Sequence, residues 1–163
     1  MAFERMDEKE AVKRAALLEK NGYRFYTLLQ DKTDNKEVRK VFKGLAKDEL
    51  RHLKIFEKRF FPEAGFSPDQ ITEEELAIEL NLERSGSSDI FTKKIDVDAL
   101  VRSIKDTRGA LITALYTERH SVEYFEEMAK NTEALEGTRL YAELAGEERR
   151  HVAEIEALLA KVE

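Results

Sequence analysis

Nearly the same eight residues occur twice in this chain of 163 residues, as LAKDELRH at positions 45–52 and as LAGEERRH at positions 144–151. The same offset of 99 residues carries Glu19 onto Glu118 without a gap. An internal repeat of this kind indicates that the chain is built from two copies of one structural unit. Whatever structure one copy adopts, the other is expected to adopt as well.

Each copy has the pattern of two helices joined by a short turn. Apolar residues at helical spacing predict a first helix over residues 3–30 and a second over residues 34–59, with the turn residues DKTDN between them. In the second copy, the pattern predicts a helix over residues 96–130, a turn at 131–132 and a last helix that ends near Val162. The inward positions predicted for the first hairpin are Val12, Ala15, Ala16, Gly22, Tyr26 and Leu29 in its first helix, and Phe42, Leu45, Ala46, Leu53 and Phe56 in its second.

A long connection of roughly 35 residues joins the two predicted hairpins. It begins with the helix breakers of FFPEAGFSPDQ, contains a capping-box pattern that predicts a short helix over residues 72–82, and includes the loop SGSSD at residues 85–89. The whole chain has only two prolines and seven glycines, which favours helix over sheet. The expected fold is therefore all-α: a single domain over residues 1–163, a four-helix bundle of two hairpins with a long crossover and a short extra helix.

Charge and composition exclude several classes of function. The chain has no cysteine, so disulfides, thiolate metal sites and cysteine nucleophiles are excluded. A net charge of -6 argues against nucleic acid as the main partner. The first residues are too charged for a signal peptide, and no apolar run is long enough to span a membrane. We expect a soluble, cytoplasmic protein.

The repeat carries paired glutamate and histidine residues. Glu49 precedes His52 by three residues, and Glu148 precedes His151 in the same way, so each pair lies on one face of a helix. Glu19 lies almost as far before the first turn as Glu49 lies after it, so the two should be level across the hairpin. The candidate metal ligands are Glu19, Glu49, His52, Glu118, Glu148 and His151.

These glutamates interrupt apolar stripes, where an unpaired carboxylate is very costly. Four carboxylates held together would repel one another and could not all stay ionised, whereas two divalent metal ions would balance their charge. Ligation by carboxylate and imidazole suits iron or manganese, and zinc is possible. The alternative is a surface helix with ion pairs, which does not explain why the glutamates lie within the apolar stripe.

The chain resembles the rubrerythrins, a branch of the ferritin-like carboxylate proteins. The resemblance extends over most of the chain and rests on the stretches LLEKNGYRFY (17–26), LAKDELRH (45–52), LYTERHSVEYF (115–125) and LAGEERRH (144–151). It implies a ferritin-like four-helix bundle with two iron ions per chain, held by the six candidate ligands. It also implies an oxidoreductase that reacts with peroxide or dioxygen.

The resemblance further assigns roles to neighbouring acids. Glu49 and Glu148 would bridge the two metals. Asp48 and Glu147 would orient the ligand histidines, although carboxylates that simply face solvent are the alternative. The hydroxyl of Tyr26, two helical turns from Glu19, could reach the site or belong to ordinary core packing.

Several features depart from the family or fall outside the candidate site. Rubrerythrins proper carry a rubredoxin domain with four cysteines, and this chain has no cysteine, so we expect an external electron donor. Many also carry a glutamate three residues after the third-helix ligand, where this chain has Ser121, matched by Gly22 in the first copy. Small residues at both places leave room near the metals. His120 is two residues past Glu118 and should face away from the site. The basic residues around KIFEKRF are interpreted as a solvated face.

Two other functions are compatible with the same sequence features. The protein could be a ferroxidase that handles or stores iron, or a bundle that binds metal only for stability. Resemblance and an apolar-rich crossover also suggest a homodimer, through Ile71, Leu76, Ile78, Leu80 and Leu82.

Overall fold

The computed structural model describes residues 8–60, 96–132 and 135–162, and the regular structure within them is entirely helical. The α-helices are α1 (Glu8–Leu29), α2 (Lys36–Ile55), α5 (Val97–Ser103), α6 (Thr107–Asn131) and α7 (Leu135–Lys161). A 3-10 turn, η1 (Gln30–Lys32), follows α1, and a π-helical turn, η2 (Phe56–Phe60), follows α2. No helix in this part of the chain is both long and apolar enough to cross a membrane.

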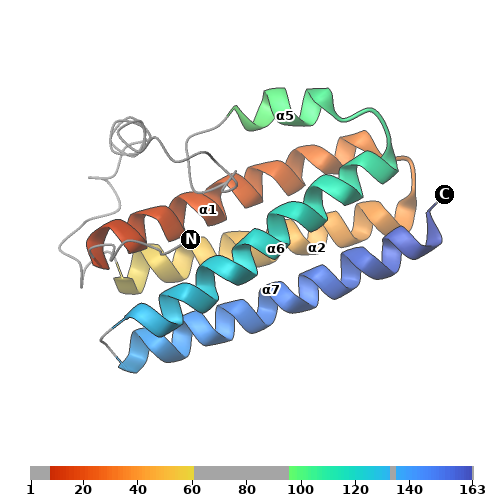
Figure 1. Cartoon of the computed structure of the whole chain (residues 1–163). Helices are drawn as coiled ribbons and strands as arrows, with labels where there is room; N and C mark the ends of the chain where they lie inside the picture. Colours follow the sequence, from red (N-terminus) through yellow and green to blue (C-terminus); the bar gives the residue numbers. More distant parts are fainter. Residues whose placement is uncertain (1–7, 61–95, 133–134, 163) are drawn as a thin grey trace.

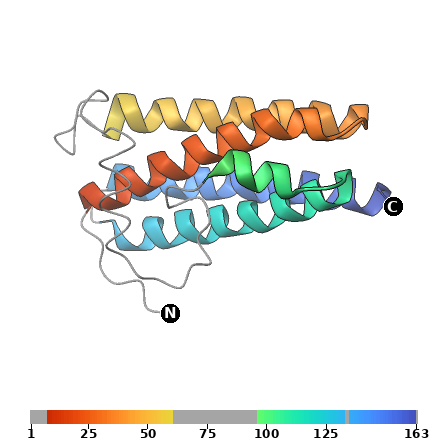
Figure 2. The same ribbon diagram turned by 90° about the horizontal axis from the view of Figure 1, so that it is seen from above.

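The four long helices form a bundle of two antiparallel hairpins (Figures 1 and 2). Helices α1 and α2 make one hairpin and α6 and α7 the other, and the hairpins meet where α1 lies against α6 and α2 against α7. The end of α2 and the start of α6 lie at opposite ends of the bundle, and α5 runs along the outside of α1 (Figure 1). The predicted all-α, ferritin-like bundle with a long crossover is confirmed.

Polar caps fix the turn of the first hairpin. The side chain of Asn35 accepts hydrogen bonds from the backbone N–H of Glu37 at 3.0 Å and of Val38 at 3.1 Å, which begins α2. The hydroxyl of Thr33 lies 2.7 Å from that of Thr107 at the start of α6. The turn of one hairpin is thereby tied to the first residue of the other, which helps to set the register between them.

One predicted helix is in fact two. The sequence predicted a continuous helix over residues 96–130, but α5 ends at Ser103 and Ile104 has extended backbone angles. The side chain of Asp106 then accepts a hydrogen bond from the N–H of Gly109 at 2.7 Å and begins α6. An aspartate that caps a new helix competes with continuation of the old one, which explains the break. The short helix and loop predicted at 72–89 lie outside the described residues, as do the apolar crossover residues and residues 1–7.

The apolar stripes pack together as the core of the bundle. The inward positions predicted for the first hairpin are buried, except that Leu53 is only half-buried. Near the end of α2, Phe56 stacks against Phe125 with ring centroids 6.2 Å apart, and it also packs against Tyr141. This aromatic layer closes the bundle on one side of the buried polar residues described below.

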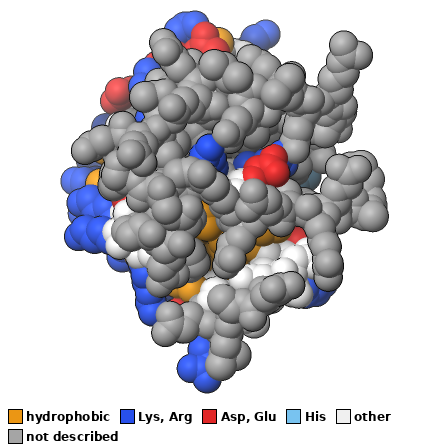
Figure 3. Space-filling view, turned by 90° about the vertical axis from the view of Figure 1, so that its left-hand side faces the viewer, with side chains coloured by type: hydrophobic (Ala, Val, Ile, Leu, Met, Phe, Trp, Pro, Cys, Tyr) orange, Lys and Arg blue, Asp and Glu red, His pale blue; other side chains and the backbone are white. Residues whose placement is uncertain are grey.

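The outer surface of α2 is basic. Figure 3 views the bundle from the end at which α2 stops and shows Lys and Arg side chains gathered along one side. The exposed basic residues of α2 and η2 are Lys36, Arg39, Lys40, Lys43, Lys47, Arg51, Lys54, Lys58 and Arg59. The basic residues around KIFEKRF are thus exposed, as predicted.

Candidate metal centre

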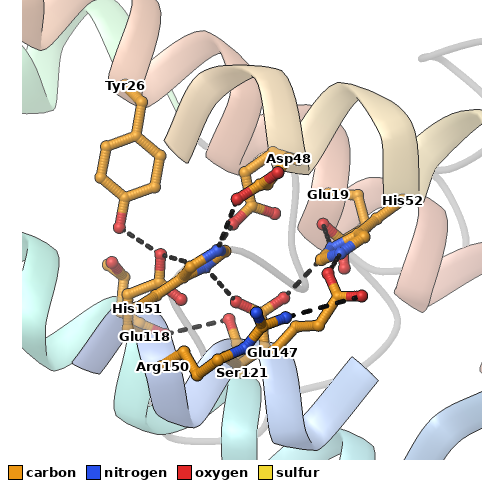
Figure 4. A network of polar contacts seen from close by, with 12 residues as sticks. Glu19, Tyr26, Asp48, His52, Glu118, Ser121, Glu147, Arg150 and His151 are labelled. Atoms are coloured by element: carbon orange, nitrogen blue, oxygen red, sulfur yellow. Dashed lines mark hydrogen bonds and ion pairs between the residues drawn. The ribbon is translucent and has the colours of Figure 1, made fainter. Parts of the chain in front are cut away.

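All four long helices place polar side chains in the middle of the bundle (Figure 4). Glu19 comes from α1, and Glu118 comes from α6. The Glu-x-x-His pairs come from α2 and α7, where a spacing of three residues puts both members on the same face. The structure brings all six predicted ligands together, and all six are buried: Glu19, Glu49, His52, Glu118, Glu148 and His151.

The six side chains form two overlapping groups of possible metal donors. The His52 group consists of Glu19, Glu49, His52 and Glu148, and the His151 group consists of Glu49, Glu118, Glu148 and His151. Within each group, one donor atom per residue lies within 4.8 Å of the others. Glu49 and Glu148 belong to both groups, which is the arrangement that a bridging role requires. The cluster is compatible with a metal site, and the role of each residue as a ligand remains a prediction.

Several donor atoms of the His52 group have no hydrogen-bond partner in the described part of the chain. They are both carboxylate oxygens of Glu19, Nδ1 of His52 and Oε1 of Glu148. The His52 Nδ1 atom lies 3.3 Å from Glu19 Oε2 and 3.3 Å from Glu148 Oε1. Buried polar atoms without partners are rare because each costs free energy. A cation between these oxygens and this nitrogen would satisfy them, so the residues fit a divalent metal.

The His151 group satisfies most of its polar atoms internally. His151 Nδ1 is 2.8 Å from Glu148 Oε2, and the hydroxyl of Tyr26 donates a short hydrogen bond to Glu118 Oε1. Apart from the shared Glu148, the buried oxygen of this group without a partner in the described segments is Glu118 Oε2. The two groups therefore differ in how far protein hydrogen bonds already occupy their donor atoms.

Each histidine is held from outside by an acid of the opposite hairpin. His52 Nε2 lies 2.6 Å from Glu147 Oε2, and His151 Nε2 lies 3.1 Å from Asp48 Oδ2. A carboxylate that accepts from Nε2 leaves Nδ1 of the same ring directed at the cluster. Of the two readings of these acids, the contacts support orientation of the histidines, although the Asp48 side chain is also 42% exposed.

Burial and mutual repulsion shift the pKa values of the carboxyl groups. Burial, with the charge of nearby Glu148, raises the pKa of Glu49 well above its ordinary value and that of Glu118 to about 8. Burial raises the pKa of Glu19 as well, reinforced by the charges of Glu148 and Glu118. For Glu148, burial also favours the neutral form, but its close contacts with His151 and His52 outweigh burial and lower the pKa. Without metal, protons must therefore neutralise part of this cluster.

The histidines are shifted in the complementary direction. Burial alone would lower the pKa of His52, yet its contacts with Glu148 and Glu49 raise that pKa to about 9. The pKa of His151 is raised in the same way, against its burial, by Glu118 and Glu148. A metal ion must displace protons from these rings, because a ligand histidine is neutral at the coordinating nitrogen.

The structure also places the other residues that the sequence singled out. Tyr26 is buried in the core, and its hydroxyl donates a hydrogen bond to Glu118; a role for it at a metal site remains a prediction. His120 belongs to neither donor group and packs against Tyr116 with ring centroids 4.4 Å apart. A Cβ atom on Gly22 would come within 3.3 Å of the Glu49 carboxylate. Ser121 is buried, and its hydroxyl donates to the backbone of its own helix.

Sequence reasoning missed one residue of this network. Arg51 Nη2 lies 2.5 Å from Glu147 Oε2 and so holds the acid that contacts His52. The repeat places Arg150 at the equivalent position, but Arg150 Nη2 lies 3.9 Å from Glu147 Oε1, too far for a hydrogen bond. The repeated arginine was visible in the sequence, whereas its contact across the hairpins depends on side-chain geometry.

Comparison with known proteins gives one family match. The Rubrerythrin family model matches residues 5–83, which include the first hairpin with Glu19, Glu49 and His52. No curated protein and no solved structure matches the chain significantly.

Proposed function

We propose, from the match of residues 5–83 to the Rubrerythrin family model, that this chain is a rubrerythrin-like di-iron oxidoreductase that reduces peroxide or dioxygen. The proposed ligands are the six buried residues of the two donor groups, with Glu49 and Glu148 shared between the metals. Iron is the proposed native metal because of the family, and the same donors would also accept manganese or zinc.

The observation that carries this proposal is the set of buried donor atoms without hydrogen bonds. Four carboxyl groups and two imidazoles lie together in the bundle interior, and both oxygens of Glu19 lack a partner among the described residues. Such a cluster is costly in an apolar core unless a cation balances it. Two divalent ions would balance four carboxylates, and the imidazoles would add two neutral donors.

The chemistry requires two electrons and two protons for each peroxide, which is converted into two water molecules. Two bound ferrous ions would supply the electrons, and an external donor would restore them. The residues of the chain hold the metals, keep them apart from bulk water and orient the rings through Glu147 and Asp48. Tyr26 places an O–H group on Glu118, next to the site where protons are consumed.

Glycine at position 22 lets the backbone of α1 lie close to a shared carboxylate. Gly22 has no side chain beside the Glu49 carboxylate, and Ser121 occupies the matching place in the second hairpin. A Cβ atom at position 22 would lie 3.3 Å from that carboxylate, so a larger residue there would crowd a proposed shared ligand. The remaining proposals rest on the sequence and on the resemblance: an external electron donor, a homodimer, and no nucleic-acid or membrane partner.

The proposal is tested by measuring metal content and turnover together. Metal-free protein loaded anaerobically with ferrous ion should bind about two iron ions per chain. The loaded protein should then consume peroxide with an artificial electron donor. Glu49→Gln keeps the shape of a shared ligand but removes its charge and should reduce both loading and turnover. Arg119→Gln, which removes an exposed ion pair with Glu156, is the control and should change neither.

Other outcomes distinguish the competing functions. A single bound metal away from Glu49 and Glu148 would refute the di-iron site. Iron uptake far beyond two ions per chain, with little peroxide turnover, would identify an iron-handling protein instead. Full loading without turnover of peroxide or dioxygen would leave a bundle in which metal is structural.

A further inference from the structure

We propose that the two donor groups bind metal in a fixed order: the His52 group takes the first ion and retains it, and the His151 group takes the second more weakly and exchanges it. This inference rests on the proposed function, because it assumes that both groups are metal sites. A nearly symmetric sequence would thereby make two unequal sites.

The first reason is the difference in unsatisfied donor atoms. The His52 group includes both oxygens of Glu19, Nδ1 of His52 and Oε1 of Glu148, none of which has a hydrogen-bond partner in the described segments. In the His151 group, Nδ1 of His151 already contacts Glu148 Oε2 at 2.8 Å. A metal in the His52 group removes an existing cost, whereas a metal in the His151 group must first displace a hydrogen bond.

The second reason is a broken symmetry between the repeats. The offset of 99 residues pairs Tyr26 with Phe125, so only one of these two positions carries a hydroxyl. The Tyr26 hydroxyl donates to Glu118, which belongs to the His151 group, whereas Phe125 has nothing to donate to the equivalent Glu19. Figure 4 shows Tyr26 pointing at Glu118 from the side opposite His52. The Tyr26 hydroxyl therefore occupies one oxygen of Glu118, whereas no such donor reaches either oxygen of Glu19.

The third reason is the unequal support of the two histidines. Glu147 contacts His52 at 2.6 Å, is held by Arg51 at 2.5 Å and is only 21% exposed. Asp48 contacts His151 at the longer distance of 3.1 Å, is 42% exposed and has Arg51 no nearer than 3.7 Å. A more buried and better-held acid fixes its ring more firmly, so His52 is the better prepared ligand.

The test uses the full chain, freed of metal and given one equivalent of Mn²⁺, with Mn²⁺ chosen because it does not oxidise readily. Anomalous scattering from crystals should show density beside Glu19 and His52 and little beside Glu118 and His151. Calorimetric titration should show two steps, and a chelator should remove one ion quickly and the other slowly. None of these measurements depends on enzymatic activity.

Matched variants assign the difference to named residues. Tyr26→Phe frees the second oxygen of Glu118 and, at a pH where Glu118 is ionised in both proteins, should tighten the second binding step while leaving the first unchanged. Tyr124→Phe removes another buried hydroxyl, which donates to the Ala11 carbonyl, and should change neither step. Glu147→Gln should weaken the first step by roughly tenfold or more, and Asp48→Asn should act on the second.

Equal density at both positions with one equivalent of metal would overturn the order, and so would density beside His151 alone. Either result would leave the proposed di-iron site standing. A chain that binds no metal would instead refute the proposed function, and the order would fall with it.

Discussion

Replacing Tyr26 by phenylalanine isolates one hydrogen bond of the metal-free site. Tyr26 is 1% exposed, and its hydroxyl donates to Glu118 Oε1. The variant keeps the ring in the core and leaves that oxygen without its donor. Because burial, together with the charge of Glu148, raises the pKa of Glu118 to about 8, the acceptor is neutral near pH 6 and ionised well above pH 8.

The cost of the substitution should therefore depend on pH. Losing a bond to a neutral acceptor costs about 1 kcal/mol, and losing one to a buried carboxylate costs about 2–3 kcal/mol. The hydroxyl favours the ionised form of Glu118, so its removal raises the pKa of Glu118 further. Stability lost in the variant thus grows as pH rises through about 8. Tyr26 itself keeps its proton over this range, because burial and the charge of Glu118 raise its pKa well above the ordinary value.

The assay is urea unfolding of the metal-free protein, followed by circular dichroism, at about pH 6 and about pH 9.5. Tyr124→Phe is the control, because Tyr124 is also buried and its hydroxyl donates at 2.7 Å to the neutral carbonyl of Ala11. Its cost should be about 1 kcal/mol at both values of pH. An equal cost of Tyr26→Phe at the two values would refute the reasoning, because Glu118 would then not titrate beneath that hydroxyl.

Two further predictions follow from the same site. Chelation of metal should lower the melting temperature, and more so at about pH 9 than at about pH 6. The pKa values of Glu118 (about 8) and His52 (about 9) are raised, so protons on these groups stabilise the metal-free fold only at lower pH. Melting curves with and without chelator that coincide at neutral pH would contradict this. Ser121→Glu should raise the rate of peroxide reduction at equal metal loading, because it adds a carboxylate three residues after Glu118, on the same helical face. Equal rates of the two proteins with an artificial electron donor would show that Ser121 does not limit the activity.

Much of the fold and of the cluster could be predicted because helical geometry relates sequence spacing directly to position. Glu49 and His52 had to share a face at a spacing of three residues, and Glu19 had to lie level with them across a short turn. The repeat then placed the other three members without further information. The structure brings all six together as expected.

The features that could not be predicted depend on local competition or on side-chain geometry. The break between α5 and α6 arises because the N-cap formed by Asp106 is more stable than a continued helix. A cap of this kind contributes about 1 kcal/mol, and the spacing of apolar residues does not reveal it. The contact of Arg51 with Glu147 joins residues on different hairpins, so no spacing along the chain encodes it. The exchange of Tyr26 for Phe125 was visible in the repeat, but its effect depended on which carboxylate the hydroxyl reached.

The crossed contacts between acids and histidines have a consequence for how the chain could be divided. His52 of the first hairpin contacts Glu147 of the second, and His151 of the second hairpin contacts Asp48 of the first. Neither hairpin alone holds a complete donor group, whereas two hairpins related by a two-fold axis would supply both. The smallest self-sufficient unit of this architecture is thus a pair of hairpins, whether they are covalently linked or not. A chain cut within the crossover should recover both donor groups when its two fragments reassociate. Two copies of the first hairpin should likewise build a symmetric bundle in which each copy contributes Glu19, Asp48, Glu49 and His52.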